Sequence, residues 1–191
     1  MTGNRPFFEK IFGENWTGMP AVFHAHYANR QNKDDIVRVI GQMDVRQSWV
    51  MSLAAPLFRI TRTLVPIDRN NIDTEVIFRT HTDCDGFWYH RHFKLGADKT
   101  YSCVSRLEHM AGNQVTEWTG AGIGWHSTFT FDGKYVRLSH LGYRFKLGRM
   151  TMPLTVNGRF GVPSAGEEAI DNTHFRRERT SRHWLFGDLY S

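Results

Sequence analysis

The feature that most constrains the fold is an almost unbroken succession of strand patterns from Ile72 to Tyr190. Apolar and polar residues alternate in short runs, which glycine and other turn residues separate at hairpin spacing. Strands joined by short turns pair antiparallel. Because few helical patterns accompany them, we expect a mainly antiparallel sheet with helices on one face or inside its curve.

The strongest local signal is Asp132-Gly133, which lies between two alternating runs. A two-residue Asp-Gly turn predicts a tight hairpin in which Phe129 faces Val136 and Trp125 faces His140. Because side chains alternate between the two faces, this register gives one apolar face. Its members are Trp125, Phe129, Phe131, Val136 and Leu138.

Before the sheet, two short helices are predicted, at about residues 7–12 and 20–27, followed by a half-buried strand at 36–45. The two helices are predicted because Pro6 and Pro20 favour helix starts and Gly13 favours the end of the first helix. Near the other end of the chain, residues 148–166 predict a long excursion, and two last strands are expected at about 169–179 and 182–190.

The segment from Trp49 to Leu64 predicts a helix that is apolar on all sides. Such a helix is either central to a core or in contact with lipid, and we expect it to be central. Its longest apolar stretch, Trp49 to Phe58, is about 15 Å long as a helix and cannot cross a hydrocarbon core of about 30 Å. Pro56 should kink it, and Arg59 and Arg62 give its far end a basic flank.

Together these patterns predict an α+β fold: a mainly antiparallel, strongly curved β-sheet or partial barrel, with an apolar central helix and short N-terminal helices. The 191 residues fit a single domain, 1–191. With only two cysteines and no signal-peptide pattern in the first residues, a cytoplasmic location is expected.

The net charge of +5 is mild and does not indicate nucleic-acid binding. A nucleic-acid interface would concentrate its cations beside stacking aromatics. The densest basic stretch, residues 176–182, contains Glu178 and places arginines on both faces of a strand. We therefore expect no nucleic-acid partner.

An ordered set of short motifs resembles a known bacterial family. Its members in this chain are Met19-Pro20, His26, Tyr89-x-Arg91-x-Phe93, Glu117 before Gly120, Gly124-Trp125, Glu167-Glu168, Asp171, Phe175, the segment 183–187 and Tyr190. Together they resemble the family called domain of unknown function 4166, over about residues 8–190. Tyr89 departs from the Trp or Phe often found in the family, and Trp184 from the usual Pro.

The resemblance implies one whole domain and brings no activity with it. Members are sometimes fused to, or found near, NAD(P)-dependent reductase domains, which implies small-molecule metabolism by association alone.

Nucleotide, hydrolase and metalloprotease motifs are absent from the sequence, so no cofactor is predicted. His90 and His92 lie two apart on a strand and share a face, and His126 is a conceivable third zinc ligand. No spacing fixes that third ligand, so we predict no metal site.

On the other face of the same strand, Arg91 lies among Tyr89, Phe93 and Leu95 and is expected to point inward. A buried guanidinium needs a partner, for which Glu117 is the candidate. The pair is either a core ion pair that fixes the sheet or an anchor for an anionic group.

His140, opposite Trp125 in the predicted register, is either a core histidine or a general acid or base. Glu168 would face a cavity mouth or begin an exposed strand.

We expect a domain that binds a hydrophobic, lipid-like or anionic small molecule between curved sheet and helix, with Arg91 at the polar end of the ligand. The ligand-binding candidates are Arg91, Glu117, Trp125, His140, Tyr89 and Glu168. One alternative is a cofactor-independent isomerase, cyclase or hydratase that uses Glu117 or His140 as base. Another is an accessory module that docks to a reductase partner or a membrane surface.

Overall fold

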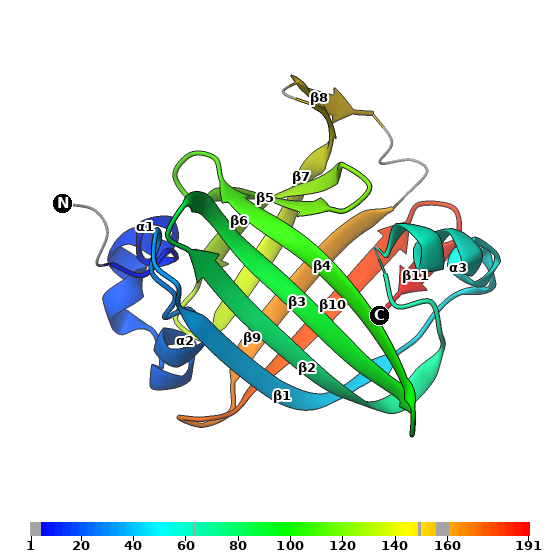
Figure 1. The fold of residues 1–191 in the computed structure, drawn as a ribbon, viewed down its shortest axis with the longest axis horizontal. Helices are drawn as coiled ribbons and strands as arrows, with labels where there is room; N and C mark the ends of the chain where they lie inside the picture. The colour runs from blue at the N-terminus through cyan, green and yellow to red at the C-terminus, as the bar shows by residue number, and fades with distance from the viewer. Residues whose placement is uncertain (1–4, 63, 149, 156–160) are drawn as a thin grey trace.

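The computed structural model describes residues 5–62, 64–148, 150–155 and 161–191 (Figure 1). Its helices are α1 (Glu9–Phe12), the 3-10 helix η1 (Gly13–Gly18), α2 (Ala21–His26) and α3 (Trp49–Thr61). Its strands are β1 (Ile36–Val45), β2 (Arg69–His81), β3 (Cys84–Gly96), β4 (Lys99–His109), β5 (Gln114–Thr119), β6 (Ile123–Phe131), β7 (Tyr135–Leu147), β8 (Met150–Leu154), β9 (Val162–Ala169), β10 (Phe175–His183) and β11 (Gly187–Tyr190).

All strands belong to one antiparallel sheet, which confirms the predicted mainly antiparallel architecture. Its order is β1-β2-β3-β4-β5-β6-β7-β9-β10-β11, and β8 pairs with β7. Apart from β8, which lies off this path, strands that follow one another in the chain are neighbours in the sheet. This order is what short hairpin connections produce.

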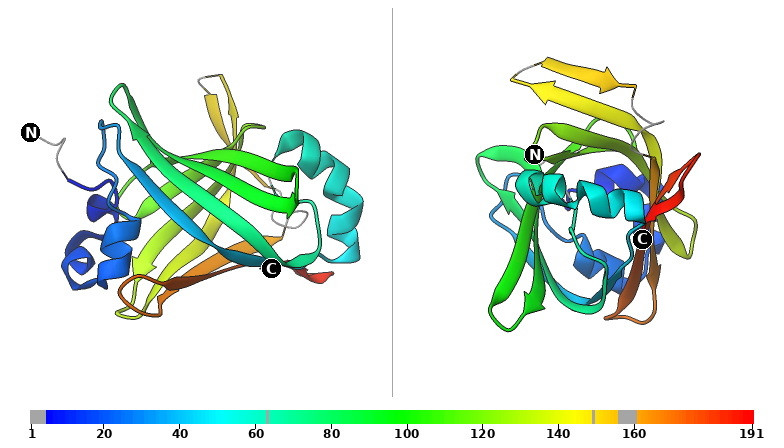
Figure 2. Two further views of the ribbon diagram at one scale, coloured as in Figure 1. Left: turned by 60° about the horizontal axis from the view of Figure 1, so that its bottom comes forward. Right: turned by 90° about the vertical axis from the view of Figure 1, so that its right-hand side faces the viewer.

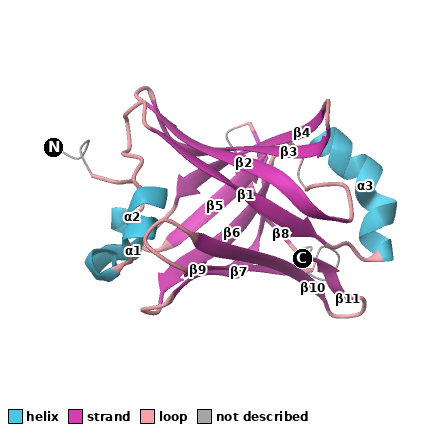
Figure 3. Ribbon diagram, turned by 90° about the horizontal axis from the view of Figure 1, so that it is seen from below, coloured by secondary structure: helices cyan, strands magenta, loops and turns pink. Residues whose placement is uncertain are grey.

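The strongly curved sheet or partial barrel that the sequence predicted is not found, because the ladder remains open. β11 has only four residues and pairs with β10 at Ser181–His183. Between the two ends of the sheet, an isolated bridge joins Gln47 to Tyr190. Most of β1 and of β10 therefore face each other without pairing along their length (Figure 3).

The hairpin at Asp132-Gly133 is present, but the predicted register is wrong by two residues. Phe129 pairs with Leu138, and Phe131 pairs with Val136. The loop is longer than expected because Oδ1 of Asp132 accepts hydrogen bonds from the backbone N–H groups of Lys134 and Tyr135. A slip of two residues preserves the faces, so the predicted apolar set is buried as expected.

The C-terminal strands differ from the predicted pattern. β8 and β9 occupy most of the described part of the predicted excursion, and residues 149 and 156–160 of that excursion lie outside the described residues. The two last strands begin later than predicted because Asp171 closes a turn by accepting hydrogen bonds from the backbone N–H groups of Thr173 and His174. β10 consequently runs from Phe175 to His183.

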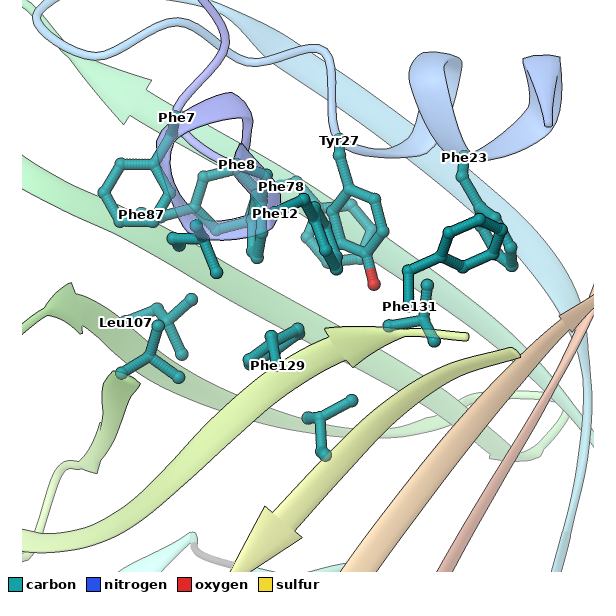
Figure 4. Packing of buried hydrophobic residues seen from close by; sticks show 14 of the residues in the cluster. Phe7, Phe8, Phe12, Phe23, Tyr27, Phe78, Phe87, Leu107, Phe129 and Phe131 are labelled. Carbon is teal, nitrogen blue, oxygen red and sulfur yellow. The ribbon is translucent and has the colours of Figure 1, made fainter. Parts of the chain in front are cut away.

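The main core lies where α1 and α2 cover one end of the inner face of the sheet (Figure 4). Phe8 is completely buried and is the centre of an aromatic cluster. Its ring centroid lies 4.3–6.0 Å from those of Tyr27, Phe87, Phe7, Phe129 and Phe12. This cluster joins the N-terminal helices to β3 and β6.

α3 is not the central helix that the sequence predicted. It lies across the opposite end of the sheet from α1 and α2 (Figures 2 and 3). Trp49, Leu53 and Ile60 are 69%, 74% and 81% exposed. Among the described side chains of the helix, Val50 and Met51 pack inward onto a second, smaller core cluster. The sheet interior holds strand side chains and the aromatic residues of α1 and α2 instead.

In the part of the chain that the structure describes, no helix has both the length and the apolar character needed to cross a membrane.

Replacing Phe8 with Ala should lower the free energy of unfolding by about 3–5 kcal/mol, because it opens a cavity in the aromatic cluster. Urea denaturation followed by circular dichroism measures the change. Ile36→Ala is the matched control: this side chain is 58% exposed, and its loss should change stability by less than about 0.5 kcal/mol. Equal losses for the two variants would contradict this assignment of the core.

Candidate functional site

A cavity of about 630 Å³ lies between β1–β4 on one side and β10 with the end of β11 on the other. Much of its wall is apolar. Val39, Val65, Val76, Phe78, Phe93 and Phe175 contribute to it. Exposed residues of β1 and β10 line its rim, among them Gln42 on β1 and Glu178 on β10. The opening therefore follows the gap between β1 and β10 in the hydrogen-bond ladder.

Arg91 reaches this cavity because β3 alternates. Tyr89, Arg91 and Phe93 point to the inner face of the sheet. Arg91 pairs across the strands with Val76 of β2 and Cys103 of β4, which also line the cavity. The prediction that Arg91 points inward is confirmed.

The predicted ion pair between Arg91 and Glu117 is also confirmed. Nη2 of Arg91 lies 2.6 Å from Oε1 of Glu117, and Nη1 donates to Oγ of Ser105 at 2.9 Å. Ser105 in turn donates to the same Glu117 oxygen at 2.6 Å. The guanidinium lies over the ring of Tyr89, 4.9 Å from its centroid. Hydrogen bonds, an ion pair and a cation–π contact thus connect four side chains from β3, β4 and β5 in one network.

This unit keeps Glu117 ionised. Burial alone would raise the pKa of Glu117, but the charges of Arg91 and Arg179 and the hydrogen bond from Ser105 lower it to about 2. Burial opposes the charged form of Arg91, and the neighbouring Glu117 nevertheless raises the pKa of that guanidinium above its usual value. A carboxylate with so low a pKa accepts protons poorly near neutral pH.

A second arginine, Arg179 of β10, enters the cavity from the opposite wall. Its guanidinium lies over the ring of Trp125, 4.9 Å from the centroid. Among the residues that the structure describes, no carboxylate lies within ion-pair distance of Arg179. Burial lowers the pKa of Arg179, Glu117 partly offsets this, and the positive charges of Arg91 and Arg177 lower it further.

A third arginine, Arg177, belongs to a separate buried cluster at the α2 end of the cavity. Its Nη1 lies 3.2 Å from Oε1 of Glu167, its partner across the β9–β10 ladder. The other oxygen of Glu167 accepts a short hydrogen bond from the hydroxyl of Tyr27 and lies 3.8 Å from Nε2 of His26. Glu167 is 1% exposed, and these three side chains are the partners of its two buried oxygens.

His26 is neutral in this environment. Burial lowers its pKa to about 4; the charge of Glu167 counteracts this, and that of Arg177 adds to it. Burial also raises the pKa of Tyr27, and the adjacent Glu167 raises it further. Within the described part of the chain, Nδ1 of the buried His26 has no hydrogen-bond partner.

The charges of the site balance in number but not in position. Arg91, Arg176, Arg177 and Arg179 are matched by Asp44, Glu117, Glu167 and Glu178, of which Asp44, Arg176 and Glu178 are exposed at the rim. On the inner side, Arg91 and Arg177 each lie against a buried carboxylate, whereas Arg179 has no carboxylate within ion-pair distance among the described residues. The arrangement therefore leaves one guanidinium to which an anionic group could bind.

The other residues proposed from the sequence lie at varying distances from this site. The ring of Tyr89 stacks on Arg91 and that of Trp125 on Arg179, but neither ring lines the cavity. His140 pairs with Ser127 instead of Trp125, and its ring packs on Tyr143. Glu168 forms an ion pair with Lys134 at 2.9 Å, away from the cavity.

The histidines considered as metal ligands do not form a metal site. Nδ1 of His92 is bonded to Ser102, and Nδ1 of His126 lies near Thr116 and the carbonyl of Val115. Over the described ranges of the chain, no cluster of three or more His, Cys, Asp or Glu side chains could hold a metal ion.

Sequence reasoning missed Arg177, Arg179, Glu167, His26 and Tyr27. A usable signal existed in β10, where Phe175, Arg177 and Arg179 alternate with Arg176 and Glu178. An apolar residue at the head of an alternating row indicates the inner face. For Glu167 and Tyr27 no such signal exists, because their contact joins residues 140 positions apart.

Replacing His26 with Phe should remove a pH dependence of stability. As the pH falls from 6.5 to 4, the unfolded chain binds a proton that buried His26 resists, so the wild-type protein loses up to about 3 kcal/mol. A phenyl ring fits among the neighbouring Phe78 and Phe175 and cannot take up a proton. Urea denaturation between pH 7 and 4.5 measures the difference.

His24→Phe on the same helix is the control for this experiment and should retain the wild-type slope. An unchanged slope in His26→Phe would contradict the assignment.

We compared the chain with known families, curated proteins and solved structures, and no match was found in any of them. The resemblance to the domain of unknown function 4166 family therefore stays a prediction.

Proposed function

We propose that this protein binds a small apolar molecule that carries one anionic group. The apolar part would occupy the cavity between β1–β4 and β10, and the anion would lie on Arg179. The observation that carries the proposal is the guanidinium of Arg179, which enters an apolar cavity and has no carboxylate partner among the described residues.

A purely structural role explains the other two arginines better than it explains Arg179. Arg91 and Arg177 each form an ion pair with a buried carboxylate. Arg179 is half-buried, and a partly desolvated charge without such a partner is costly. Stacking on Trp125 compensates only part of this cost, and the free edge of the guanidinium suits a carboxylate or phosphate.

The dimensions of the cavity also support a small-molecule ligand. Cavities that hold such ligands measure about 300–1,000 Å³ and are mostly apolar with a few polar groups. A volume of about 630 Å³ lies inside this range. The inner side of the sheet forms one wall of this binding site, as the sequence led us to expect. The opposite wall is β10 and not a central helix.

Catalysis by Glu117 or His140 has less support. The low pKa of Glu117 makes it a weak base, and His140 does not line the cavity. No set of nucleophile, base and orienting group is formed around Arg91 in the described structure.

Arg179→Met should weaken binding of a long-chain carboxylate about 10- to 100-fold, because a charge-assisted hydrogen bond is lost. The probe is cis-parinaric acid, whose fluorescence rises in apolar surroundings, displaced by dodecanoate. Dodecanol, which has the same chain without the charge, should displace the probe poorly from the wild-type protein. The substitution should change the affinity for dodecanol little.

Arg179→Met should fold as stably as the wild type, because it removes an unpaired charge. Arg91→Met is the contrasting variant: it leaves Glu117 without its main partner and should cost about 3 kcal/mol of stability. Equal binding of dodecanoate by the wild type and Arg179→Met would overturn the proposal.

Gly41→Phe should close the cavity. Gly41 lies on the rim, and a Cβ built there meets no atom within 4 Å. Its backbone is extended in β1, so a larger side chain causes no strain. Binding of the fluorescent acid should fall at least about tenfold, as measured by fluorescence titration.

Ile36→Phe adds the same ring to an exposed position of the same strand and should leave binding intact. If Gly41→Phe bound the probe as well as this control does, the cavity would not be the binding site.

A further inference from the structure

The end of the molecule formed by α3 and the turn between β10 and β11 exposes an unusual number of large apolar side chains. We call this surface the α3 end and define it by Trp49, Leu53 and Ile60 of α3, Trp184, Leu185 and Phe186 of the turn, and the neighbouring cations Arg59, Arg62 and Lys99. Figure 2 shows α3 lying across the end of the sheet, and Figure 1 shows β11 beside it.

The outer side of α3 carries an apolar stripe. Trp49, Leu53 and Ile60 recur at intervals of four and seven residues and therefore form one stripe along the helix. All three are more than two-thirds exposed. A surface helix of a globular protein normally turns charged and polar residues toward water, whereas this stripe contains none.

The turn between β10 and β11 extends the same apolar surface. Trp184 is 80% exposed, Leu185 60% and Phe186 46%. The rings of Trp49 and Phe186 lie edge to face with centroids 6.2 Å apart, so helix and turn form one continuous patch. Contiguous exposed apolar surface of this kind marks an interaction site.

The cations beside the patch are not neutralised. Arg59 and Arg62 at the end of α3 and Lys99 of the β3–β4 hairpin line a second cavity of about 460 Å³, with Tyr101 and Ser102. No carboxylate lines it. None of the three cations forms an ion pair with any residue in the described part of the chain. The other arginines nearby, Arg46 and Arg182, are paired with Asp68 and Asp188.

We propose that the α3 end docks on the surface of a bilayer containing anionic phospholipids. Trp49, Leu53, Trp184 and Leu185 would enter the interfacial region, and a lipid phosphate would lie among Arg59, Arg62 and Lys99. Tryptophan side chains favour the membrane–water interface. A helix with Trp and Leu exposed beside arginines is typical of proteins that lie on a membrane without crossing it.

Charge complementarity favours a bilayer over a second copy of this chain. In a symmetric dimer through this face, the unpaired cations of both copies would approach one another. An anionic lipid surface supplies the missing negative charge and the apolar layer together. This inference does not depend on the ligand proposed for the larger cavity.

The test is sedimentation of the purified full chain with vesicles of phosphatidylcholine alone or mixed with phosphatidylglycerol. Wild-type protein should bind the mixed vesicles at low salt, bind neutral vesicles more than about tenfold less, and dissociate as salt is added. Arg59→Glu/Arg62→Glu and, separately, Trp49→Ser/Trp184→Ser should each weaken binding by more than about tenfold.

Matched controls carry the same changes elsewhere. Arg5→Glu/Lys33→Glu alters exposed cations near α1 and β1, and Ile36→Ser/Ile170→Ser removes exposed apolar side chains from β1 and the β9–β10 turn. Both should bind like the wild type, and all variants should retain the wild-type circular dichroism spectrum because the changed residues are exposed.

Quenching by lipids brominated in their acyl chains supplies a second readout. Tryptophan fluorescence of the wild type should be quenched, and quenching should be lost in Trp49→Phe/Trp184→Phe, whose remaining tryptophans lie away from the α3 end. Absence of binding to mixed vesicles would overturn the proposal. So would controls that bind as weakly as the α3-end variants, or a concentration-dependent dimer that Leu53→Asp dissociates.

Discussion

The interior of this sheet depends on two buried carboxylates. Glu117 and Glu167 each hold an arginine that would otherwise be a charge in an apolar space. Glu117 of β5 reaches Arg91 of β3 across the intervening β4, and Glu167 of β9 pairs with Arg177 on the neighbouring β10. Ser105 and Tyr27 complete the hydrogen bonds of these carboxylates. Removing either carboxylate would leave unpaired positive charge inside the sheet.

These pairs also determine what remains available to a ligand. Arg91 and Arg177 use part of their hydrogen-bonding capacity on their own carboxylates, while Arg179 stacks on Trp125 and has no carboxylate within ion-pair distance among the described residues. The same low dielectric that strengthens the two ion pairs raises the cost of the third charge. In the proposed mode of binding, the arginines that have an acidic neighbour stabilise the sheet, and the one without such a neighbour binds the ligand.

The antiparallel sheet, the N-terminal helices, β1 and the Arg91–Glu117 pair could be predicted from alternation and turn residues, because these signals are local. The position of α3 could not. A helix that is apolar on all sides has the same sequence pattern whether it is buried or exposed. The position of α3 is decided by the aromatic residues of α1, α2 and the strands, which already fill the core. The cluster of Arg177, Glu167 and Tyr27 could not be predicted either, because Tyr27 and Glu167 are 140 positions apart in the sequence and no local pattern links them.

The unpaired edges of β1 and β10 have a consequence for solubility. Free strand edges are templates on which other chains can add, and natural sheets protect them with outward charges. Arg38 and Asp44 of β1 and Arg176 and Glu178 of β10 are exposed along these edges. Charges of both signs lie along these edges, so two molecules that met edge to edge would have to desolvate charged side chains. These charges thereby disfavour edge-to-edge association at the gap between β1 and β10.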